Sequence, residues 1–375
     1  MVAVKVGIVV PYSWSFWGGV VEHAELQADA LRALGCEVKT IMGNDPPGQF
    51  TRVLHPRHGR HGNPPADVIP IGRSVIVPAN GSLPNIILSP RSVLRIRDVL
   101  RREQFDVVHL HEPMTPTPCI ATLAMCTAPM VGTFHASGEL GWMKFGKRAW
   151  GFLAERLDRR IAVSERARES AARWLPGDYE LVPNGVLIPP QAESSGRQHR
   201  IVFAGRHETR KGLQVLLEAW PEIRRRTGAT LRICGADPLA VRLLLTRLRV
   251  SEEGIDVLGF LPQEVFTEEL LAAKALVAPS LGGESFGIVL VRAMACATPV
   301  VASDIPGYRD VMTPETAVPF PASDRQALAD AVESLLADEA RRQAMGAAGR
   351  ALAQERYSWD AIASRLLDIY AAVAA

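Results

Sequence analysis

Short, continuously apolar segments, each followed by a polar loop and an amphipathic segment, recur in both halves of the chain. In the first half, Val6–Val10 leads through a loop to a segment of helical character from about 20 to 34. In the second half, Arg200–Gly205 leads through a basic loop to Leu213–Arg226. A strand without apolar–polar alternation is expected to be covered on both faces, as in parallel sheets with crossover helices. The pattern therefore predicts an α/β fold with two parallel-sheet domains.

The length of 375 residues also suits two domains. Residues 187–199 contain two prolines, two serines and a glycine among few apolar side chains, which is the composition of a linker. We expect a first domain over residues 1–186, the linker over 187–199, and a second domain over 200–357. Ser358 is a candidate N-cap for a last helix from Ala361 to Ala372.

Composition excludes several classes of protein. Apolar residues make up 47% and charged residues 22%, and the net charge of +2 gives no global basis for binding nucleic acid. The number of cysteines, five, is odd, and no two of them form a C-x-x-C pair, which favours buried free thiols in a reducing cytosol.

Two apolar segments are not expected to be targeting or membrane segments. The apolar stretch at the start of the chain is too short for a signal peptide, and residues 113–138 fit a helix followed by a strand better than a membrane span.

The stretch Leu281–Ala295 combines a glycine loop, one carboxylate and an apolar segment of helical character. Backbone N–H groups at a helix start suit a phosphate, and the Glu284 carboxylate beside them suits sugar hydroxyls. We interpret the stretch as the place where a nucleotide sugar is held, although an acidic residue there can also be only a helix cap. The N–H groups concerned are those of Phe286, Gly287, Ile288 and Val289.

Two further segments suit a nucleotide sugar. Arg206 and Lys211, on one loop after a strand, could stabilise a leaving diphosphate in place of a metal ion, because no D-x-D pair stands at a strand end. Alternatively, Arg206 and Lys211 are ordinary charged side chains on the surface that contact only water. Gly18 and Gly19 would let the backbone approach the phosphates, and a plain tight turn is the alternative.

Histidines mark the ends of two expected strands. His111, followed by Glu112, closes one strand, and His135 closes the next. Ligands bind at the carboxyl ends of strands in open α/β sheets, so we favour a functional role over simple packing. His55, His58 and His61 fit a loop better than a metal site, because no carboxylate or cysteine accompanies them at ligand spacing.

The segment Arg91–Arg102 is a basic amphipathic helix with apolar residues on one face. Such a helix can lie on an anionic membrane surface or can be an ordinary surface helix that covers a sheet.

Taken in order, Gly18-Gly19, His135, Arg206 with Lys211, and Gly283–Gly287 resemble the signature of retaining glycosyltransferases of family 4. The resemblance spans nearly the whole chain. It implies the GT-B fold, in which two Rossmann-like domains face each other across a cleft and a C-terminal helix, here 358–375, crosses back to the first domain. It also implies metal-independent hexosyl transfer with retention, in which the leaving diphosphate acts as base.

The family resemblance implies a role for each matched residue. Glu284 would bind hydroxyls of the donor sugar, and His135 would contact the ring beside the anomeric carbon. Arg206 and Lys211 would stabilise the departing nucleoside diphosphate. Gly19 and the N–H groups near Gly287 and Ile288 would hold phosphate. The donor would be GDP-mannose or a UDP-sugar, with no cofactor and no metal ion.

Within the family, the chain resembles the branch that mannosylates phosphatidylinositol, through Pro11-Tyr12-Ser13, Asn80-Gly81-Ser82, His111-Glu112-Pro113 and the run Leu281–Val291. That resemblance implies acceptor contacts from Tyr12, Asn80, His111 and Glu112. It implies a lipid- or polyprenol-linked acceptor, such as phosphatidylinositol, for a cytoplasmic enzyme peripheral on the inner face of the membrane. The basic helix Arg91–Arg102 has a membrane-binding counterpart in that branch. A glycosyltransferase with a soluble small-molecule acceptor is the alternative.

Three departures from the family pattern qualify these expectations. Arg292 stands where a second glutamate usually reads the ribose hydroxyls of the donor, and an arginine cannot accept hydrogen bonds. In that branch, an acidic and a basic residue at the place of Leu261–Phe266 help bind guanine. That pair is lacking here, which favours a UDP-sugar as an alternative donor. Pro84-Asn85 replaces an arginine that helps hold inositol phosphate. Arg292 would also suit an inactive nucleotide-sugar-binding protein, and a non-hydrolysing epimerase would need Glu112 and Glu139 as its acid–base pair.

Overall fold

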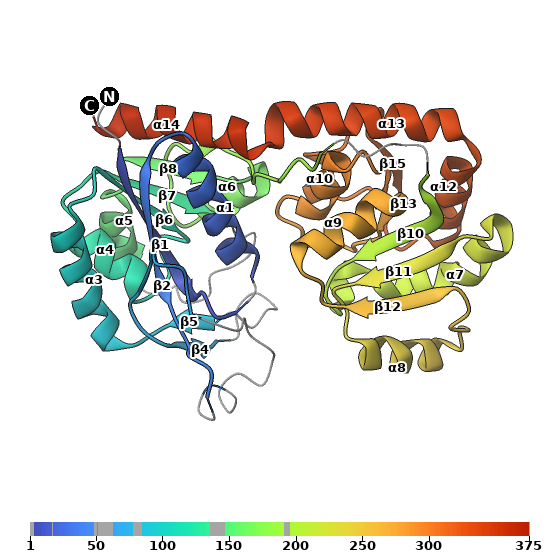
Figure 1. The fold of residues 1–375 in the computed structure, drawn as a ribbon, viewed down its shortest axis with the longest axis horizontal. Helices are drawn as coiled ribbons and strands as arrows, with labels where there is room; N and C mark the ends of the chain where they lie inside the picture. Colours follow the sequence, from blue (N-terminus) through green and yellow to red (C-terminus); the bar gives the residue numbers. More distant parts are fainter. Residues whose placement is uncertain are drawn as a thin grey trace. The chain divides into compact units, whose positions relative to one another are not determined.

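The computed structural model describes residues 4–16, 18–48, 51, 63–77, 85–135, 147–190 and 196–374. The chain divides into two compact units. Unit 1 comprises residues 1–185 together with the C-terminal segment 359–375, and unit 2 comprises residues 186–358. In each unit, helices flank one central sheet (Figure 1).

Unit 1 is built on a sheet with strand order β3-β2-β1-β6-β7-β8-β9, in which all these neighbours pair in parallel. The hairpin β4–β5 adds to β1 in antiparallel fashion. The elements are β1 (Lys5–Ser13), α1 (Gly19–Ala33), β2 (Glu37–Gly43), β3 (Val68–Pro70), β4 (Ser74–Ile76), β5 (Asn85–Ile87), α3 (Pro90–Glu103), β6 (Val107–His111), α4 (Pro118–Met125), β7 (Met130–Phe134), α5 (Lys147–Ala154), β8 (Arg159–Ala162), α6 (Glu165–Ala172), β9 (Glu180–Leu181) and α14 (Trp359–Ala374).

Strand β1 explains why the first apolar segment shows no alternation. Val6, Ile8 and Val10 point to a core shared with α1 and α14, including Leu366 of α14. Val9 points the other way, into a core that contains residues of α3, α4 and α5. Both faces of the sheet are therefore buried, and the C-terminal helix α14 completes one of them.

Unit 2 has a six-stranded parallel sheet with the order β12-β11-β10-β13-β14-β15. Residues of α7, α8 and α12 cover one face, and residues of α9 and α10 cover the other. The elements are β10 (Gln198–Ala204), the 3₁₀ turn η2 (Thr209–Lys211), α7 (Leu213–Thr227), β11 (Thr230–Cys234), α8 (Pro238–Leu248), β12 (Ile255–Gly259), α9 (Gln263–Ala272), β13 (Ala273–Ala278), α10 (Ile288–Ala295), β14 (Val300–Ser303), α11 (Pro306–Arg309), β15 (Ala317–Phe320), α12 (Arg325–Ala337), α13 (Glu339–Leu352) and the π-helical segment η3 (Ala353–Tyr357).

Several expected boundaries were wrong. Strand β1 continues to Ser13, because Tyr12 pairs with Ile86 of the unforeseen strand β5. Strand β10 begins at Gln198, inside the stretch interpreted as linker, where Gln198 pairs with β13. The last helix begins at Trp359, directly after Ser358, rather than at 361. Each difference arises from pairing or packing with residues distant in sequence.

Other expectations were confirmed. Segment 113–138 contains a helix and a strand, α4 and β7. All five cysteines are free, and all but the half-buried Cys36 are buried. Burial raises the pKa of the Cys234 and Cys296 thiols to about 12, so both stay protonated at neutral pH. Within the described ranges, every helix is too short or too polar to cross a membrane.

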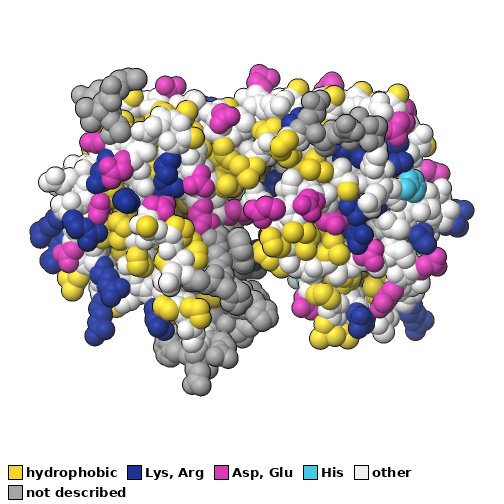
Figure 2. All heavy atoms as spheres, in the orientation of Figure 1, with side chains coloured by type: hydrophobic (Ala, Val, Ile, Leu, Met, Phe, Trp, Pro, Cys, Tyr) yellow, Lys and Arg dark blue, Asp and Glu magenta, His cyan; other side chains and the backbone are white. Residues whose placement is uncertain are grey.

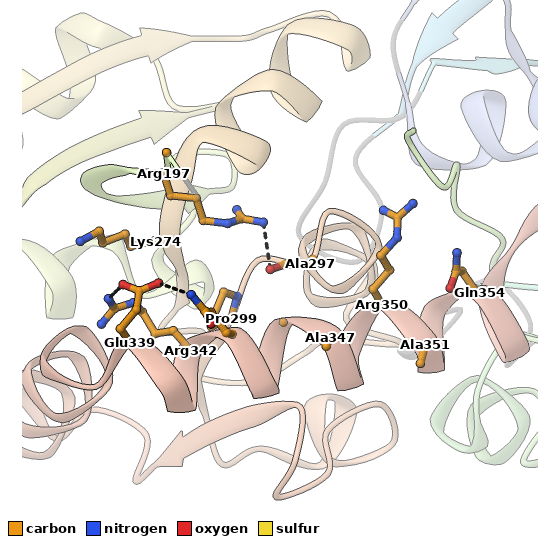
Figure 3. A pocket seen from close by; sticks show the side chains of 13 residues that line it. Arg197, Lys274, Ala297, Pro299, Glu339, Arg342, Ala347, Arg350, Ala351 and Gln354 are labelled. Carbon is orange, nitrogen blue, oxygen red and sulfur yellow. Dashed lines mark hydrogen bonds and ion pairs between the residues drawn. The ribbon is translucent and has the colours of Figure 1, made fainter. Parts of the chain in front are cut away.

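At the amino edge of the unit 2 sheet, three helices end beside a cavity of about 720 Å³ (Figure 3). Arg197 is the centre of this region. Its Nη1 donates to the carbonyls of Leu270 and Ala273, at 3.1 and 2.9 Å, in the last turn of α9 and at its C-cap. Its Nη2 donates to the carbonyl of Cys296, at 2.7 Å, beyond the last turn of α10.

Two further arginines of this cavity make similar contacts with helix ends. Arg342 donates to the carbonyls of Leu335 and Leu336 at the end of α12, and Arg350 donates to that of Ala295 at the end of α10. These guanidinium groups neutralise the partial negative charge of the helix ends. Carbonyl oxygens and the Glu339 carboxylate accept from these donors, so the arginines of this cavity serve to stabilise helix ends.

Replacing Arg197 should destabilise the chain. Arg197→Ala would leave several helix-end carbonyls without a donor in a half-buried place, so the free energy of unfolding should fall by about 2–4 kcal/mol. Urea denaturation measures this change. The matched control is Arg325→Ala, whose exposed ion pair with Glu218 spans 3.6 Å and should contribute less than about 0.5 kcal/mol. Equal losses for the two variants would contradict the capping role.

Candidate functional site

The loop between β13 and α10 carries the carboxylate that the sequence singled out. Gly283 and Gly287 have φ of +70° and +79°, a left-handed conformation that suits glycine. Gly287 also has no room for a side chain, because a Cβ there would lie 2.9 Å from the ring of Tyr308. Between these glycines the Glu284 side chain turns inward, and the residue is only 8% exposed.

The buried Glu284 carboxylate is held by two cations and a hydroxyl. The Lys211 Nζ lies 2.8 Å from its Oε1, and the Arg210 Nη1 lies 3.0 Å from the same oxygen. Ser280 Oγ donates to Oε1 at 3.1 Å. Two opposite charges offset the cost of burying the carboxylate. Oε2 accepts a hydrogen bond from Lys211 Nζ at 3.0 Å, and a carboxylate oxygen can also accept one from a ligand hydroxyl.

Ser280 connects the carboxylate to a buried tyrosine. Its Oγ lies 2.8 Å from Tyr308 Oη, so Tyr308, Ser280 and Glu284 form one hydrogen-bonded chain. Burial and the charge of Glu284 raise the pKa of Tyr308, which stays a neutral hydroxyl. Sequence reasoning missed both residues, because Tyr308 lies on a different element, α11, and no local motif marks it.

The basic turn, residues 205–212 between β10 and α7, packs directly against the carboxylate loop, residues 279–287 between β13 and α10. A Cβ on Gly212 would lie 1.8 Å from the carbonyl oxygen of Pro279, so only glycine allows this close approach. The turn contains the two predicted cations and a third that was missed. Arg210 pairs with both Glu284 and Glu208, whereas Arg206 pairs with Glu208 at 2.8 Å and keeps a side chain that is 54% exposed.

Helix α10 starts at the end of the carboxylate loop. The Phe286 side chain is buried against the Tyr357 ring, which anchors the start of the helix. Ile288 and Val289 occupy the first turn, where backbone N–H groups have no intrahelical acceptor. The N–H groups proposed for phosphate therefore do lie at a helix N-terminus.

Arg292 lies at the other end of α10, in its last turn. The side chain is half-buried, and its charge acts to lower the pKa of the nearby Cys296 thiol against the larger effect of burial. A cation in the last turn interacts favourably with the helix dipole.

In unit 1, Gly18 caps the start of α1 and Gly19 is its first residue. Neither has a positive φ, and a Cβ on either would meet no atom within 4 Å. Packing therefore does not require glycine at these positions. The open space beside them is compatible with close approach by a ligand.

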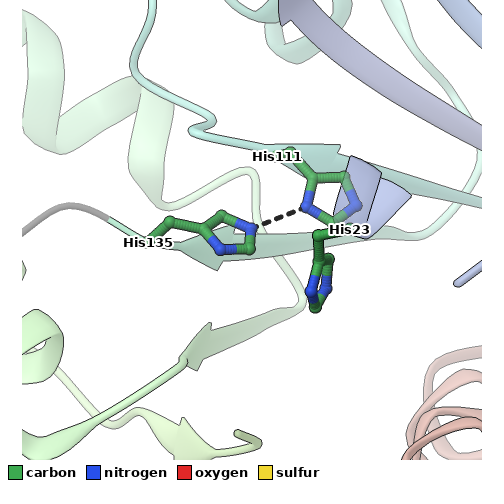
Figure 4. Close-up of side chains that lie close together, drawn as sticks. All are labelled: His23, His111 and His135. Atoms are coloured by element: carbon green, nitrogen blue, oxygen red, sulfur yellow. Dashed lines mark hydrogen bonds between the residues drawn. The ribbon is translucent and has the colours of Figure 1, made fainter. Parts of the chain in front are cut away.

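Four histidines gather at the carboxyl edge of the unit 1 sheet. His109 and His111 lie on β6, His135 follows β7, and His23 lies on α1 (Figure 4 draws His23, His111 and His135). The His111 Nδ1 and His135 Nε2 atoms are hydrogen-bonded at 2.8 Å. The His23 ring lies 4.8 Å from the His135 ring, centroid to centroid. Sequence reasoning selected His111 and His135 and missed the other two.

His109 links the cluster to the C-terminal helix. Its Nδ1 lies 2.6 Å from Tyr370 Oη of α14, and its Nε2 lies 2.6 Å from Thr133 Oγ1 of β7. Gln27 of α1 contacts both His109 and Tyr370 at 3.1 Å. The i, i+2 spacing of His109 and His111 places both on one face of β6, a signal in the sequence that could have identified His109.

All four rings have lowered pKa values, chiefly because burial disfavours the charged form. The pKa of His109 falls to about 3 and that of His135 to about 4. His23 and His111 lie well below their ordinary pKa for the same reason, and the neighbouring histidines lower them further. At neutral pH the whole cluster is uncharged.

The predicted acceptor residues lie beside this cluster. Glu112, which has a positive φ of 51°, accepts a hydrogen bond on Oε1 from the backbone N–H of His135, at 3.0 Å. Burial and the charge of Glu112 raise the pKa of Tyr12, so these two side chains are neighbours. Asn80, Glu139, His55, His58 and His61 lie outside the described residues.

Comparison with known proteins identifies the family. The description Glycosyltransferase Family 4 matches residues 17–187, and the description Glycosyl transferases group 1 matches residues 198–338. A phosphatidyl-myo-inositol mannosyltransferase from Mycobacterium leprae is 35% identical over 99% of this chain and 97% of its own length. The chain belongs to glycosyltransferase family 4. A protein of the same name from Mycobacterium tuberculosis is 33% identical over 99% of this chain and 97% of its own.

Solved structures place this glycosyltransferase in the GT-B fold, as expected. Sucrose-phosphate synthase from Thermosynechococcus elongatus superposes with a TM-score of 0.72 and 21% identity, and the match covers 98% of each chain. An Anabaena protein, Alr3699/HepE in complex with UDP, superposes with a TM-score of 0.70 and 18% identity over 98% of this chain and all of the other. At these identities the likeness concerns the fold alone.

The histidine cluster should make this glycosyltransferase less stable in mild acid. The unfolded chain takes up a proton on each histidine near pH 6.5, whereas folded His109 does so only near 3. Stability should therefore be greatest above pH 6.5. As the pH falls from 6.5 toward 3, the free energy of unfolding should drop by up to about 1.4 kcal/mol per pH unit for each such histidine.

The change of slope on mutation tests this expectation. In His109→Gln, nearly one proton fewer is taken up on unfolding, so the free energy of unfolding should depend less steeply on pH between 7 and 5. Urea denaturation at several pH values measures it. The exposed His207, replaced in the control His207→Gln, should leave the slope as in the wild type. A slope unchanged in His109→Gln would rule out a neutral, buried His109.

Proposed function

We propose that this glycosyltransferase moves mannose from GDP-mannose to phosphatidylinositol, or to a related lipid-linked acceptor, at the cytoplasmic face of the membrane. The transfer retains the anomeric configuration and needs no metal ion. The main support is 33–35% identity, over nearly the full length, to relatives named phosphatidyl-myo-inositol mannosyltransferases. A UDP-sugar is the second candidate donor, because Leu261–Phe266 departs from the guanine-reading pattern that the family resemblance implies.

In unit 2, the carboxylate loop and the basic turn bind the donor in this proposal. The Glu284 Oε2 atom accepts hydrogen bonds from the sugar hydroxyls, while Lys211 and Arg210 fix the carboxylate. The amides of Phe286, Gly287, Ile288 and Val289 at the start of α10 hold a diphosphate oxygen, favoured by the helix dipole. Arg292, beyond this turn, replaces an acceptor of ribose hydroxyls with a donor.

Negative charge develops on the diphosphate as the glycosidic bond breaks. Arg206, Arg210 and Lys211 form a cationic group close to Glu284 that can stabilise this charge without a divalent ion. Arg206 suits direct contact with the diphosphate, because its side chain is the most exposed of the three. The acceptor hydroxyl attacks the face from which the diphosphate leaves, and a diphosphate oxygen takes its proton.

In unit 1, His135 contacts the sugar ring beside the anomeric carbon. Its lowered pKa of about 4 keeps it neutral, so it can hydrogen-bond a hydroxyl without competing with the cations for the diphosphate. Gly18 and Gly19 offer their backbone to phosphate. Tyr12, His111 and Glu112 bind the acceptor hydroxyls in this scheme, together with Asn80, which the family resemblance adds.

Helix α3 is the proposed membrane contact. It contains five arginines and two acids, and Leu94 on it is 54% exposed. Figure 2 shows Lys and Arg side chains gathered over the region where Figure 1 places α3. Among the described residues, Arg91, Arg95 and Arg101 are exposed and have no acidic partner. Free cations beside an exposed leucine suit the headgroup region of an anionic bilayer.

The transfer itself is tested by a donor screen with phosphatidylinositol vesicles, in which nucleotide release and labelled lipid are measured. We expect GDP-mannose to support transfer in the presence of EDTA, and the product to have the α configuration by NMR. Glu284→Gln should lower the rate by about 100-fold or more, because the sugar loses a charged acceptor.

The matched control for this assay is Glu252→Gln, which changes an exposed acid of unit 2. Its rate should stay within a factor of about two of the wild type. Thermal unfolding of Glu284→Gln separates loss of fold from loss of the site. A folded Glu284→Gln enzyme with a near-normal rate would contradict the site, and no transfer from any nucleotide sugar to any lipid would contradict the function.

Membrane binding is tested by flotation with vesicles that contain anionic lipid. Replacing Arg91, Arg95 and Arg101 with glutamine should weaken partitioning by about two orders of magnitude, since each basic residue near the surface contributes about 1 kcal/mol. The control replaces the exposed Arg242, Arg325 and Arg341 of unit 2 and should bind as the wild type does. Equal binding by both triple variants, or binding insensitive to salt, would exclude α3 as the contact.

A further inference from the structure

Three histidines of unit 1 converge on one point at the carboxyl edge of the sheet. His23 comes from α1, His111 from the end of β6, and His135 from the residue after β7. One ring nitrogen from each lies within 4.8 Å of the other two. Figure 4 shows the His111 and His135 rings facing each other, with the His23 ring beside them.

The spacing of these nitrogens is close to that of a transition-metal site. Imidazole nitrogens bind Zn²⁺ at about 2.0–2.1 Å in tetrahedral geometry, which places any two ligand nitrogens about 3.3 Å apart. The His111 Nδ1 to His135 Nε2 distance is 2.8 Å, and the widest separation in the set is within 4.8 Å. These values lie on either side of the required distance, so small ring rotations would bring all three nitrogens to it.

The chemistry of the cluster favours a borderline-soft cation. The set consists of neutral imidazoles, which suit Zn²⁺, Cu²⁺ or Ni²⁺, whereas Mg²⁺ and Ca²⁺ require oxygen ligands. Lone pairs are available at neutral pH, because burial keeps the rings unprotonated. The His111 Nε2 atom is buried and has no hydrogen-bond partner within the described ranges, so this ring can change tautomer.

Two amide side chains lie beside these rings. Gln27 acts to raise the pKa of His23 and Asn184 acts to raise that of His135, against the larger effect of burial, so each amide is a neighbour of one ring. Such outer contacts orient histidine ligands in metal sites. With three protein ligands, a tetrahedral ion would keep a fourth position for water or a hydroxyl.

We propose that His23, His111 and His135 form a binding site for Zn²⁺ and that the bound ion inhibits glycosyl transfer. Inhibition follows because the metal occupies the lone pair with which His135 would contact the donor sugar. The binding stands independently of the proposed function, whereas the inhibition rests on it. Transfer itself needs no metal in this account, so the ion is an inhibitor and not a cofactor.

Binding is tested on metal-free protein without a polyhistidine tag. Calorimetry with ZnCl₂ should give one ion per chain and none with MgCl₂, and Co²⁺ should give the visible absorption of a four-coordinate ion. His23→Gln and His135→Gln should each weaken Zn²⁺ binding by at least about tenfold, since even outer-shell changes cost that much. Circular dichroism checks that both variants are folded.

The matched control replaces three histidines outside the proposed site that could also bind a metal ion. A variant with His55→Gln, His58→Gln and His61→Gln should bind Zn²⁺ as the wild type does. If this variant loses the bound ion, or if folded His23→Gln and His135→Gln keep wild-type affinity, the proposed site is wrong.

The inhibition is tested separately, as the ratio of transfer rates with and without Zn²⁺. This ratio should fall in the wild type and stay near one in His23→Gln. If Zn²⁺ binds to the cluster and the transfer rate does not change, the inhibition is overturned together with the sugar contact of His135, while the metal site stands. If no transfer is found at all, calorimetry still decides the site.

Discussion

A parallel sheet that is buried on both faces leaves the ends of its strands as the places where a ligand can reach its side chains. In unit 1, β1 contributes Val6 and Ile8 to one core and Val9 to the other, and unit 2 repeats this arrangement with Ile201 and Val202 of β10. The remaining architecture depends on this constraint. The candidate site residues of both units lie at carboxyl edges, at or after the ends of β1, β6 and β7 in unit 1 and after β10 and β13 in unit 2.

The two units bury polar groups at these edges in opposite ways. Unit 2 buries the charge of Glu284 and compensates it with Lys211, Arg210 and a hydroxyl chain to Tyr308. Unit 1 keeps its histidines neutral and links one of them, His109, by a hydrogen bond to Tyr370 of the C-terminal helix. The charged residues of unit 2 suit a ligand group on which charge develops, and the neutral histidines of unit 1 suit uncharged hydroxyls. The same neutrality makes the unit 1 cluster a ligand set for a soft cation.

Local signals were enough for part of this description. The apolar runs predicted parallel strands, and the glycines around Glu284 predicted a loop that leads into a helix. Lys211 and Arg206 could be chosen because they follow a strand. Arg210 and Tyr308 could not be chosen, because Arg210 contacts Glu284 across 74 residues of chain and Tyr308 contacts Ser280 across 28. Tyr12 was expected in a loop, yet it extends β1 by pairing with Ile86 of a strand too short to recognise.

The sequence by itself determined the fold class, the family and most of the residues around the carboxylate, because periodicity and short motifs depend only on near neighbours along the chain. Only the tertiary structure decided what those residues contact. It made Glu284 the partner of two cations, gave Arg197 the ends of two helices to neutralise, and brought His23 of α1 beside His111 and His135. Burial and distance set the charge state of each group, and both depend on packing between segments that are far apart in sequence.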